Sequence, residues 1–189
     1  MLGSGKGSNF VAIADAIARG DLPAEVRLVI SDVENAGILE HARRFGFPTA
    51  FVPPGRFRTK LEPEAEQRVV DLLREAGVDL VVLAGYMRMI KPPLLEAFPN
   101  RIINIHPSLL PAFPGLEAWT QALAAGAPVT GCTVHYVDAG MDSGEIIAQR
   151  EAPVLPGDTP ATLHARIQEQ EHSLYPEVIR RLAAEMGKA

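Results

Sequence analysis

The chain has 189 residues, of which 47% are hydrophobic and 22% are charged, a composition that suits one globular domain with a substantial core. The formal net charge of −5, without a basic block, argues against nucleic acid as a partner, and the single cysteine, Cys132, excludes a disulfide and a zinc ribbon. No apolar run is long enough to cross a membrane and no signal-peptide pattern opens the chain, so we expect a cytoplasmic protein that does not bind membranes.

The first feature along the chain is the glycine-rich loop 3–9, GSGKGSN, followed by apolar residues at helical spacing over 10–18. Glycines let backbone N–H groups approach an anion closely, and the start of a helix adds free N–H donors and a favourable dipole. We therefore expect this loop to hold a phosphate rather than to be only a tight turn. Such a loop should follow a strand, yet only Met1 and Leu2 precede it, so we expect the first strand to be truncated and the gene to extend upstream.

Two familiar nucleotide-binding motifs are poor matches to this loop. It is not a P-loop, because Gly7 follows the lysine where Ser or Thr is required. The dinucleotide fingerprint needs a third glycine where Ser8 stands, although Asp32 lies near the position of a ribose-binding acid. A nicotinamide-dependent oxidoreductase therefore stays open as an alternative.

Strands and helices then alternate as far as residue 105, which predicts a doubly wound, Rossmann-like α/β fold with a mostly parallel sheet. The predicted strands are 25–30, 49–52, 78–83 and 102–105, and the predicted helices are 36–45, 63–76 and 92–98. A small basic cluster follows the second of these strands and consists of Arg56, Arg58 and Lys60. This cluster is either a solvated loop or a contact for an anionic group.

The central stretch 101–115, RIINIHPSLLPAFPG, brings two polar side chains to the end of a buried strand. Asn104 and His106 are two residues apart, so both leave the same face of the strand. Pro107 and Pro111 then stop regular pairing, because proline offers no N–H. Ligands bind at strand ends in open α/β sheets, so we expect a functional site here rather than two structural polar groups.

Beyond residue 115 the pattern predicts a helix at 116–125, an antiparallel hairpin of strands at 129–137 and 145–152, and a long C-terminal helix to about residue 186. Thr159 and Pro160 are a typical N-cap and first-turn pair for that helix. We expect residues 1–189 to form a single domain, whose N-terminal half, to about residue 100, binds a phosphorylated ligand and whose C-terminal half carries the catalysis.

Three groups are placed to converge: the pair Asn104 and His106, the glycine-rich loop, and Asp142 in the loop between the hairpin strands. An amide can donate to a developing oxyanion, an imidazole can act as acid, base or cation near neutral pH, and a carboxylate can orient the imidazole and accept a proton. These groups favour acyl or proton transfer on a phosphorylated substrate.

Other chemistries find less support. No activated nucleophile is evident, since Ser108 follows the histidine too closely and Cys132 has the setting of a core residue. The histidines at 41, 164 and 172 fall on predicted helices. His106, His135 and Asp142 lack the spacing of a metal site, so no metal is expected.

Four motifs, GSGKGSN, LAGYMRMI, NIHPSLLPAFPG and GCTVHYVDAGMDSG, resemble in this order those of the folate-dependent formyltransferases, over essentially the whole chain. NIHPSLLP is shared with formyltetrahydrofolate hydrolases, whereas GSGKGSN and PGLE favour the members that formylate glycinamide ribonucleotide in purine synthesis. The resemblance implies the formyltransferase fold, a cytoplasmic monomer or homodimer, and direct transfer from 10-formyltetrahydrofolate without a metal or a covalent intermediate. A hydrolase, another folate formyltransferase and a ligand-binding protein without activity remain alternatives.

The resemblance also implies roles for individual residues. Catalysis would fall to Asn104, His106 and Asp142, with support from His135 on the neighbouring strand. The first two would stabilise the oxyanion that forms when the glycinamide amine attacks the formyl carbon, with His106 protonated, and Asp142 would keep His106 charged and help to move a proton. The ribonucleotide would be held by Gly7, Ser8, Asn9, Gln168 and Glu171. The folate pocket would be formed, within the C-terminal half and the segment before it, by Lys60, Met87, Arg88, Met89, Ile90, Asn104, Asp138, Ala139, Gly140, Met141 and Asp142.

Overall fold

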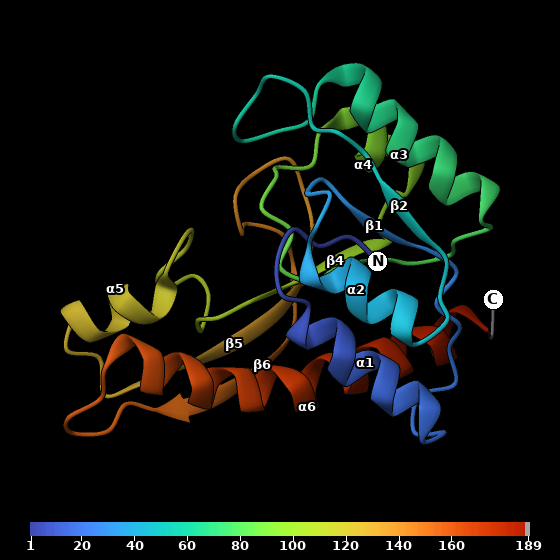
Figure 1. Ribbon diagram of the computed structural model, residues 1–189. Helices are drawn as coiled ribbons and strands as arrows, with labels where there is room; N and C mark the ends of the chain where they lie inside the picture. The colour runs from blue at the N-terminus through green and yellow to red at the C-terminus, as the bar shows by residue number, and fades with distance from the viewer. Residues whose placement is uncertain (188–189) are drawn as a thin grey trace.

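The computed structural model describes residues 1–187 and has a twisted sheet at its centre with helices on both faces (Figure 1). The helices are α1 (Ser8–Ala18), α2 (Gly37–Arg44), α3 (Pro63–Glu75), α4 (Pro92–Ala97), α5 (Ala118–Ala124) and α6 (Pro160–Met186). The strands are β1 (Val29–Ser31), β2 (Thr49–Phe51), β3 (Val81–Leu83), β4 (Ile102–His106), β5 (Val129–Tyr136) and β6 (Ile146–Pro153).

The strands pair in the order β2-β1 and β3-β4-β5-β6, and residue Leu2 joins these two groups. Leu2 forms parallel bridges to Ile30 of β1 and to Leu83 of β3, so the chain start occupies the position of a central strand. β1 and β2 are parallel, as are β3 and β4, whereas β5 runs antiparallel to both β4 and β6. The predicted parallel sheet with an antiparallel C-terminal hairpin is therefore confirmed.

Two hydrophobic clusters lie on opposite faces of the sheet, because successive side chains of a strand point to opposite sides. Val82 of β3 belongs to the cluster under α1, α2 and α6, while Val81 and Leu83 belong to the cluster under α3 and α4. Figure 1 shows α3 and α4 on one side of the sheet and α1 and α6 on the other, with α5 beside the start of α6. This is the doubly wound arrangement that the alternating pattern predicts.

Several predicted boundaries are wrong by a few residues, and each has a local cause. The first strand begins at Val29 rather than residue 25, because only Met1 and Leu2 lie beside it on the inner side. β3 begins at Val81 rather than residue 78, because the Val78 N–H still closes α3 by donating to Leu73 O. α5 begins at residue 118 rather than 116, because Glu117 has the left-handed φ of 52°.

The long helix α6 ties the two halves of the sheet together. Thr159 caps its start through a reciprocal hydrogen-bond pair with Thr162, and Pro160 occupies the first turn, as predicted. The buried Tyr175 hydroxyl donates to Leu83 O at 2.7 Å, and Ile103 O lies at 3.2 Å, so α6 is fixed to the end of β3 and to the residue of β4 that precedes Asn104. Within residues 1–187, no helix has the length and apolar character needed to cross a membrane.

Candidate active site

Strand β4 presents Asn104 and His106 on one face at the point where regular pairing ends. In the register with β5, Asn104 lies opposite His135 and His106 lies opposite Thr133. The intervening Ile105 points to the hydrophobic core on the other face. The strand pattern therefore places two histidines and one amide together, two from β4 and one from its antiparallel neighbour.

Asp142 reaches this group from the loop between β5 and β6. Its Oδ2 atom accepts a hydrogen bond from the Gly115 N–H at 2.9 Å and lies 3.4 Å from Nδ1 of His106. Its Oδ1 atom lies 3.8 Å from Nε2 of His135. Asp142 has a left-handed φ of 51°, an unusual conformation for a residue with a side chain, and in it the carboxylate lies between the two imidazoles.

The hydrogen bonds of His135 define its tautomer. Nδ1 lies 2.8 Å from the carbonyl oxygen of Tyr136, which can only accept, so Nδ1 carries the proton. Burial lowers the pKa of His135, so at neutral pH its Nε2 is an acceptor without a proton. Nδ2 of Asn104 lies 3.4 Å from this Nε2 atom. A neutral His135 thus orients the Asn104 amide with its N–H groups toward the cluster.

Both ring nitrogens of His106 face acceptors. Nε2 lies 2.9 Å from the carbonyl oxygen of Phe113, and Nδ1 faces the carboxylate of Asp142. This arrangement suits the doubly protonated ring, because a bare Nδ1 would confront the lone pairs of the carboxylate. The cluster therefore offers an amide donor, an imidazole with an acceptor at each ring nitrogen and a carboxylate within one small region, the set needed to stabilise an oxyanion and move a proton.

The glycine-rich loop is built by close packing. Gly7 has a left-handed φ of 81° and directly precedes α1, and a Cβ atom there would lie 2.7 Å from Cα of Ile38. Ser4 Oγ donates to Asp32 at 2.5 Å and accepts from the Met87 N–H at 3.0 Å. Asp32 also receives Nε of Arg88 at 2.7 Å. Because this acid is buried and fully engaged, it is not placed as a ribose-binding group of a nicotinamide site.

The loop meets α6 through one pair of side chains. Nδ2 of Asn9 donates to Oε2 of Glu171 at 3.1 Å. Glu171 is only 5% exposed, and desolvation raises the pKa of its carboxyl to about 7. Oδ1 of Asn9 is buried and has no hydrogen-bond partner among the residues that the structure describes. Gln168 lies one turn earlier on α6 and is half-buried.

The predicted folate pocket has a rim built from three segments. Residues 57–60 are tied to residues 88–89, since the Met89 N–H donates to Thr59 O and the Arg88 guanidinium donates to Phe57 O. Lys60 lies over the Phe57 ring, with Nζ 4.6 Å from its centroid. Met87 and Met141 are 61% and 59% exposed, whereas Ile90 is buried in the core.

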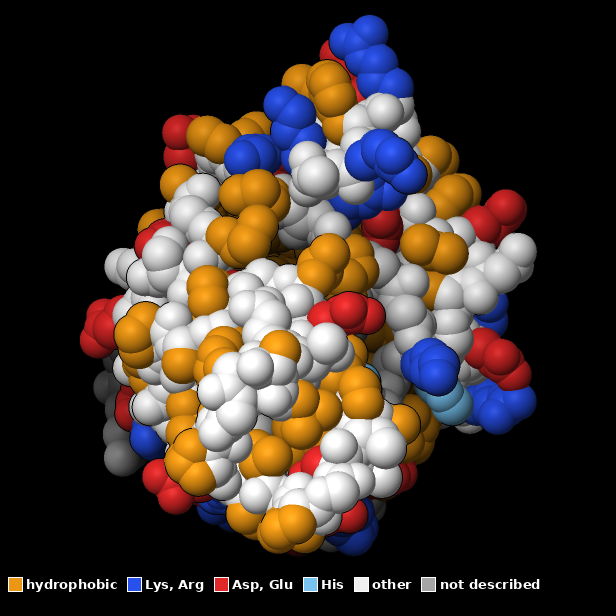
Figure 2. Space-filling model, turned by 90° about the vertical axis from the view of Figure 1, so that its left-hand side faces the viewer, with side chains coloured by type: hydrophobic (Ala, Val, Ile, Leu, Met, Phe, Trp, Pro, Cys, Tyr) orange, Lys and Arg blue, Asp and Glu red, His pale blue; other side chains and the backbone are white. Residues whose placement is uncertain are grey.

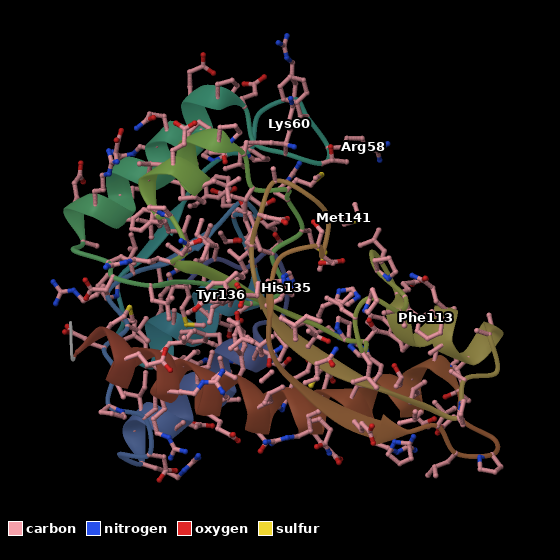
Figure 3. The ribbon with its side chains drawn as sticks, turned by 180° about the vertical axis from the view of Figure 1, so that it is seen from behind. Arg58, Lys60, Phe113, His135, Tyr136 and Met141 are labelled. Atoms are coloured by element: carbon pink, nitrogen blue, oxygen red, sulfur yellow. The ribbon has the colours of Figure 1, made fainter. Side chains whose placement is uncertain are left out.

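The figures show the same rim from two sides. In Figure 3, Lys60 and Arg58 lie above Met141, with His135 below it and Phe113 to one side. Figure 2 shows Lys and Arg side chains gathered at the upper end of the molecule, above hydrophobic side chains. An apolar, aromatic ligand with an anionic end fits this distribution of side chains. Arg88 contributes little charge to it, because its guanidinium is engaged by Asp32.

Three groups at the site were not anticipated from the sequence. Ser4 connects the glycine-rich loop to Asp32 and Met87, and Phe113 and Gly115 contact His106 and Asp142 through backbone atoms. The only sequence signal for the last two is the Phe-Pro-Gly turn itself, because backbone contacts leave no residue-type signature.

The surroundings of Cys132 and Ser108 indicate structural rather than catalytic roles. Burial raises the pKa of Cys132 to about 12, which leaves it a thiol rather than a nucleophile. Ser108 donates its hydroxyl to Ala112 O at 2.5 Å. Within residues 1–187 no group of three or more His, Cys, Asp or Glu side chains is arranged to hold a metal ion.

Comparison with known proteins gives matches along almost the whole chain. Residues 1–179 match the family described as formyl transferase. A phosphoribosylglycinamide formyltransferase of Bacillus subtilis is 44% identical over 182 residues, which cover 96% of this chain and 92% of that protein. Glycinamide ribonucleotide transformylase 1 from Symbiobacterium toebii superposes with a TM-score of 0.93 at 50% identity, covering 97% of this chain and 86% of that one. Phosphoribosylglycinamide formyltransferase from Bacillus halodurans gives a TM-score of 0.90 at 46% identity, covering 96% and 92%.

Proposed function

The chain belongs to the formyl transferase family and transfers a formyl group to glycinamide ribonucleotide in purine biosynthesis; we propose that 10-formyltetrahydrofolate is the donor and that Asn104, His106 and Asp142 are the catalytic residues. One observation carries this assignment of residues. The Asp142 carboxylate lies between Nδ1 of His106 and Nε2 of His135, beside the Asn104 amide. No other cluster of polar side chains in the described residues combines a carboxylate, an imidazole and an amide.

The ribonucleotide would bind where the glycine-rich loop meets α6. The N–H groups of Gly7, Ser8 and Asn9 lie at the start of an eleven-residue helix, the setting that favours a phosphate. Glu171 and Gln168 would accept and donate hydrogen bonds to the ribose. The buried Oδ1 of Asn9 supports a ligand at this position, because an unpaired buried acceptor is costly and a donor from the ligand would satisfy it.

The formyl donor would occupy the rim between residues 87–90 and the loop 138–142. Met87, Met89 and Met141 would contact its apolar ring system, and the backbone of Arg88, of Ile90 and of residues 138–140 would supply polar contacts. Lys60 would face the carboxylates at its other end, with Arg58 nearby. The donor supplies the formyl group. The protein would bind and orient the two substrates and help to move a proton to the folate nitrogen.

In the proposed mechanism, the bond from the glycinamide nitrogen to the formyl carbon forms, and the bond from that carbon to the folate nitrogen breaks. Asn104 and the protonated His106 donate to the oxygen on which negative charge develops. Asp142 keeps His106 charged and accepts the proton released by the amine, directly or through water, so that it ends on the folate nitrogen. His135 orients Asn104 as a neutral ring.

A mixing assay tests the proposal. The protein is incubated with glycinamide ribonucleotide and 10-formyltetrahydrofolate, and formation of tetrahydrofolate is followed by its absorbance. We expect turnover that requires both substrates and is lost in Asn104→Ala and His106→Ala. Absorbance change without the ribonucleotide would indicate a hydrolase, and a chain that binds both ligands without turnover would be a binding protein only.

Three broader expectations accompany this proposal. We place phosphate binding in the N-terminal half of one domain and catalysis and folate binding in the C-terminal half, with the boundary near residue 100. We also propose a cytoplasmic location and a monomer or homodimer that acts on small molecules, without nucleic acid or membrane partners. Size-exclusion chromatography with light scattering measures the oligomeric state.

A further inference from the structure

The turn between β4 and α5 has an unusual backbone for a segment with only one glycine. Phe113, Gly115 and Glu117 all have left-handed φ values, of 53°, 81° and 52°. This region is disfavoured for residues with a side chain, so such a run persists only where surrounding contacts impose it. The contacts here are with the catalytic groups: Phe113 O meets Nε2 of His106, and Gly115 N–H meets Oδ2 of Asp142.

The contact from Phe113 determines which nitrogen of His106 is free to act. A backbone carbonyl has no proton to give, so Nε2 must be the donor in this 2.9 Å hydrogen bond. Nδ1 is then the nitrogen that faces Asp142, at 3.4 Å. That distance is long for a strong hydrogen bond, so the Nδ1 proton is available to another acceptor. The carboxylate that Nδ1 faces also approaches Nε2 of His135, and that atom lies 3.4 Å from Nδ2 of Asn104.

We propose that Phe113 is a positioning residue, whose backbone carbonyl holds the Nε2–H of His106 so that Nδ1 is the nitrogen presented to Asp142 and to the reacting atoms. The inference rests on the proposed function, because it assigns the acting nitrogen of the proposed catalytic histidine. The left-handed turn directs the Phe113 carbonyl toward the ring. Gly115, two residues later, holds the Asp142 carboxylate on the other side of the ring.

The charged groups around His106 are few, which makes its protonation a usable readout. Asp142 faces Nδ1 of His106, His135 lies on the neighbouring strand β5 beside Asp142, and Asp138 lies near His135. Strand β3 and residues 107–116 carry no titratable side chain, and Glu117 at the end of the turn is exposed. Asp142 is the one charged group among these that contacts the His106 ring, and the Phe113 carbonyl is the uncharged acceptor on its other side.

The first test uses the unaltered protein and needs no substrate. In ¹⁵N-histidine-labelled protein, long-range correlation spectra distinguish protonated from bare ring nitrogens, and the His106 signals are assigned by their loss in His106→Gln. We expect the neutral form of the ring to carry its proton on Nε2, with Nδ1 bare. A neutral form protonated at Nδ1 would overturn the inference, while leaving the proposed formyl transfer, measured separately, intact.

The second test weakens the carbonyl alone. Replacing Pro114 by lactic acid through nonsense suppression turns the Phe113–Pro114 amide into an ester, whose carbonyl is a poorer acceptor. Pro114 has no N–H, so no donor is lost, and Pro114→Ala is the matched amide control. We expect kcat about three- to tenfold below that of the control, with KM unchanged, the magnitude of weakening one hydrogen bond to a charged group.

The pH profile separates positioning from a merely structural role. Because the ester stabilises the imidazolium less, the alkaline limb of kcat should move to lower pH by up to about one unit, the equivalent of a tenfold change in proton affinity. Equal kcat and equal pH profiles in the ester and in Pro114→Ala would overturn the inference. If the ester protein does not fold, the tautomer measured in the unaltered protein still decides the question.

Discussion

Two loops that reach the candidate active site differ in the contacts that hold them. The loop 3–9 is fixed by close backbone packing, since a Cβ at Gly7 would lie 2.7 Å from Cα of Ile38 and one at Gly3 would lie 2.6 Å from Ala84 O. The loop 138–144 is also closely packed, since a Cβ at Gly144 would collide with Tyr136 O, and it adds carboxylate contacts. Asp138 accepts from the Gly140 N–H within the loop, and Asp142 accepts from Gly115 outside it.

The two loops should therefore be sensitive to different substitutions. A loop held by volume should tolerate a change of charge and fail when an atom is added. The second loop should tolerate a change of volume only at exposed positions that already carry a side chain, and it should fail when the charge of Asp142 is removed.

Asp142→Asn removes the charge and keeps the shape. Asparagine tolerates the left-handed φ of 51° and can still accept from Gly115, so the free energy of unfolding should change little. Turnover should fall by roughly 10²–10⁴, the usual worth of positioned acid–base help, because His106 loses its counter-charge. Steady-state kinetics and calorimetric titration with the ribonucleotide measure kcat and affinity separately, and the affinity should stay within about twofold.

Glu145→Gln is the matched control, because it removes an exposed negative charge just after the same loop. Its kcat should remain near that of the unaltered protein. Near-normal turnover in Asp142→Asn would remove this carboxylate from the mechanism and leave it only the role of closing the loop.

Gly7→Ala adds one carbon atom to the other loop. The added Cβ meets Ile38 and the residue must keep a φ of 81°, so the free energy of unfolding should fall by about 2–4 kcal/mol, the sum of overpacking and left-handed strain. Urea denaturation measures it. This result would separate a packing role for Gly7 from the phosphate contact that the sequence predicts.

Gly5→Ala is the companion variant, since a Cβ there meets no atom and its φ is not left-handed. Its stability should lie within about 1 kcal/mol of the unaltered protein. Reduced ribonucleotide affinity in this variant, with folate affinity unchanged, would therefore report contact with the ligand. Equal destabilisation by both substitutions would contradict the volume argument.

The fold could be predicted from periodicity because its helices and strands bury one or both faces in a regular pattern. The exact ends could not, because they depend on partners: Leu2 limits the pairing of β1, and the φ of Glu117 delays α5. The grouping of Asn104 and His106 follows from a spacing of two residues. Their grouping with His135 depends on the register between β4 and β5, which no local pattern fixes.

The supporting contacts were harder to foresee than the catalytic candidates. Phe113 and Gly115 act through backbone atoms, and the partners of Asp32 come from segments 28 and 56 residues away in sequence. The burial of Glu171, which decides its proton affinity, depends on how α6 packs against α1. A sequence shows which group is present, whereas desolvation is a property of the assembled neighbourhood.

Glu171 gives the loop 3–9 a contact with a titratable carboxyl group, through Asn9, in addition to the contact between Ser4 and Asp32. Its pKa is about 7 in the folded protein against an ordinary value of 4.5, so folding favours its protonated form. Stability from this group is therefore present below about pH 4.5 and is lost as the pH rises through about 7. The loss amounts to about 3 kcal/mol at most, by the usual conversion of a pKa shift.

Glu171→Gln should remove this pH dependence. Urea denaturation at pH 5 should give similar stability for both proteins, and at pH 8 the variant should be more stable by about 1–3 kcal/mol. The gain should come with weaker ribonucleotide binding, since the ribose loses its charged acceptor. Parallel loss of stability in both proteins between pH 5 and pH 8 would place the titrating group elsewhere.

The smallest effect is expected at Lys60 on the rim, because its side chain is not part of the buried ion pair between Arg88 and Asp32. Lys60 is half-exposed, and its ammonium lies 4.6 Å from the centroid of the Phe57 ring. An exposed ion pair with the donor's carboxylates is worth about 0.2–1 kcal/mol, so Lys60→Gln should raise the folate KM by about 1.5- to 5-fold with kcat unchanged. The increase should shrink as salt is added, because exposed charges are screened.

Lys60→Arg should restore the low KM. Arg74→Gln makes the same charge change at an exposed position of α3 and should leave the KM unaltered. A KM that does not respond to Lys60→Gln at low salt would make the basic cluster a solvated loop, and a fall in kcat instead would mean that the rim takes part in the chemical step.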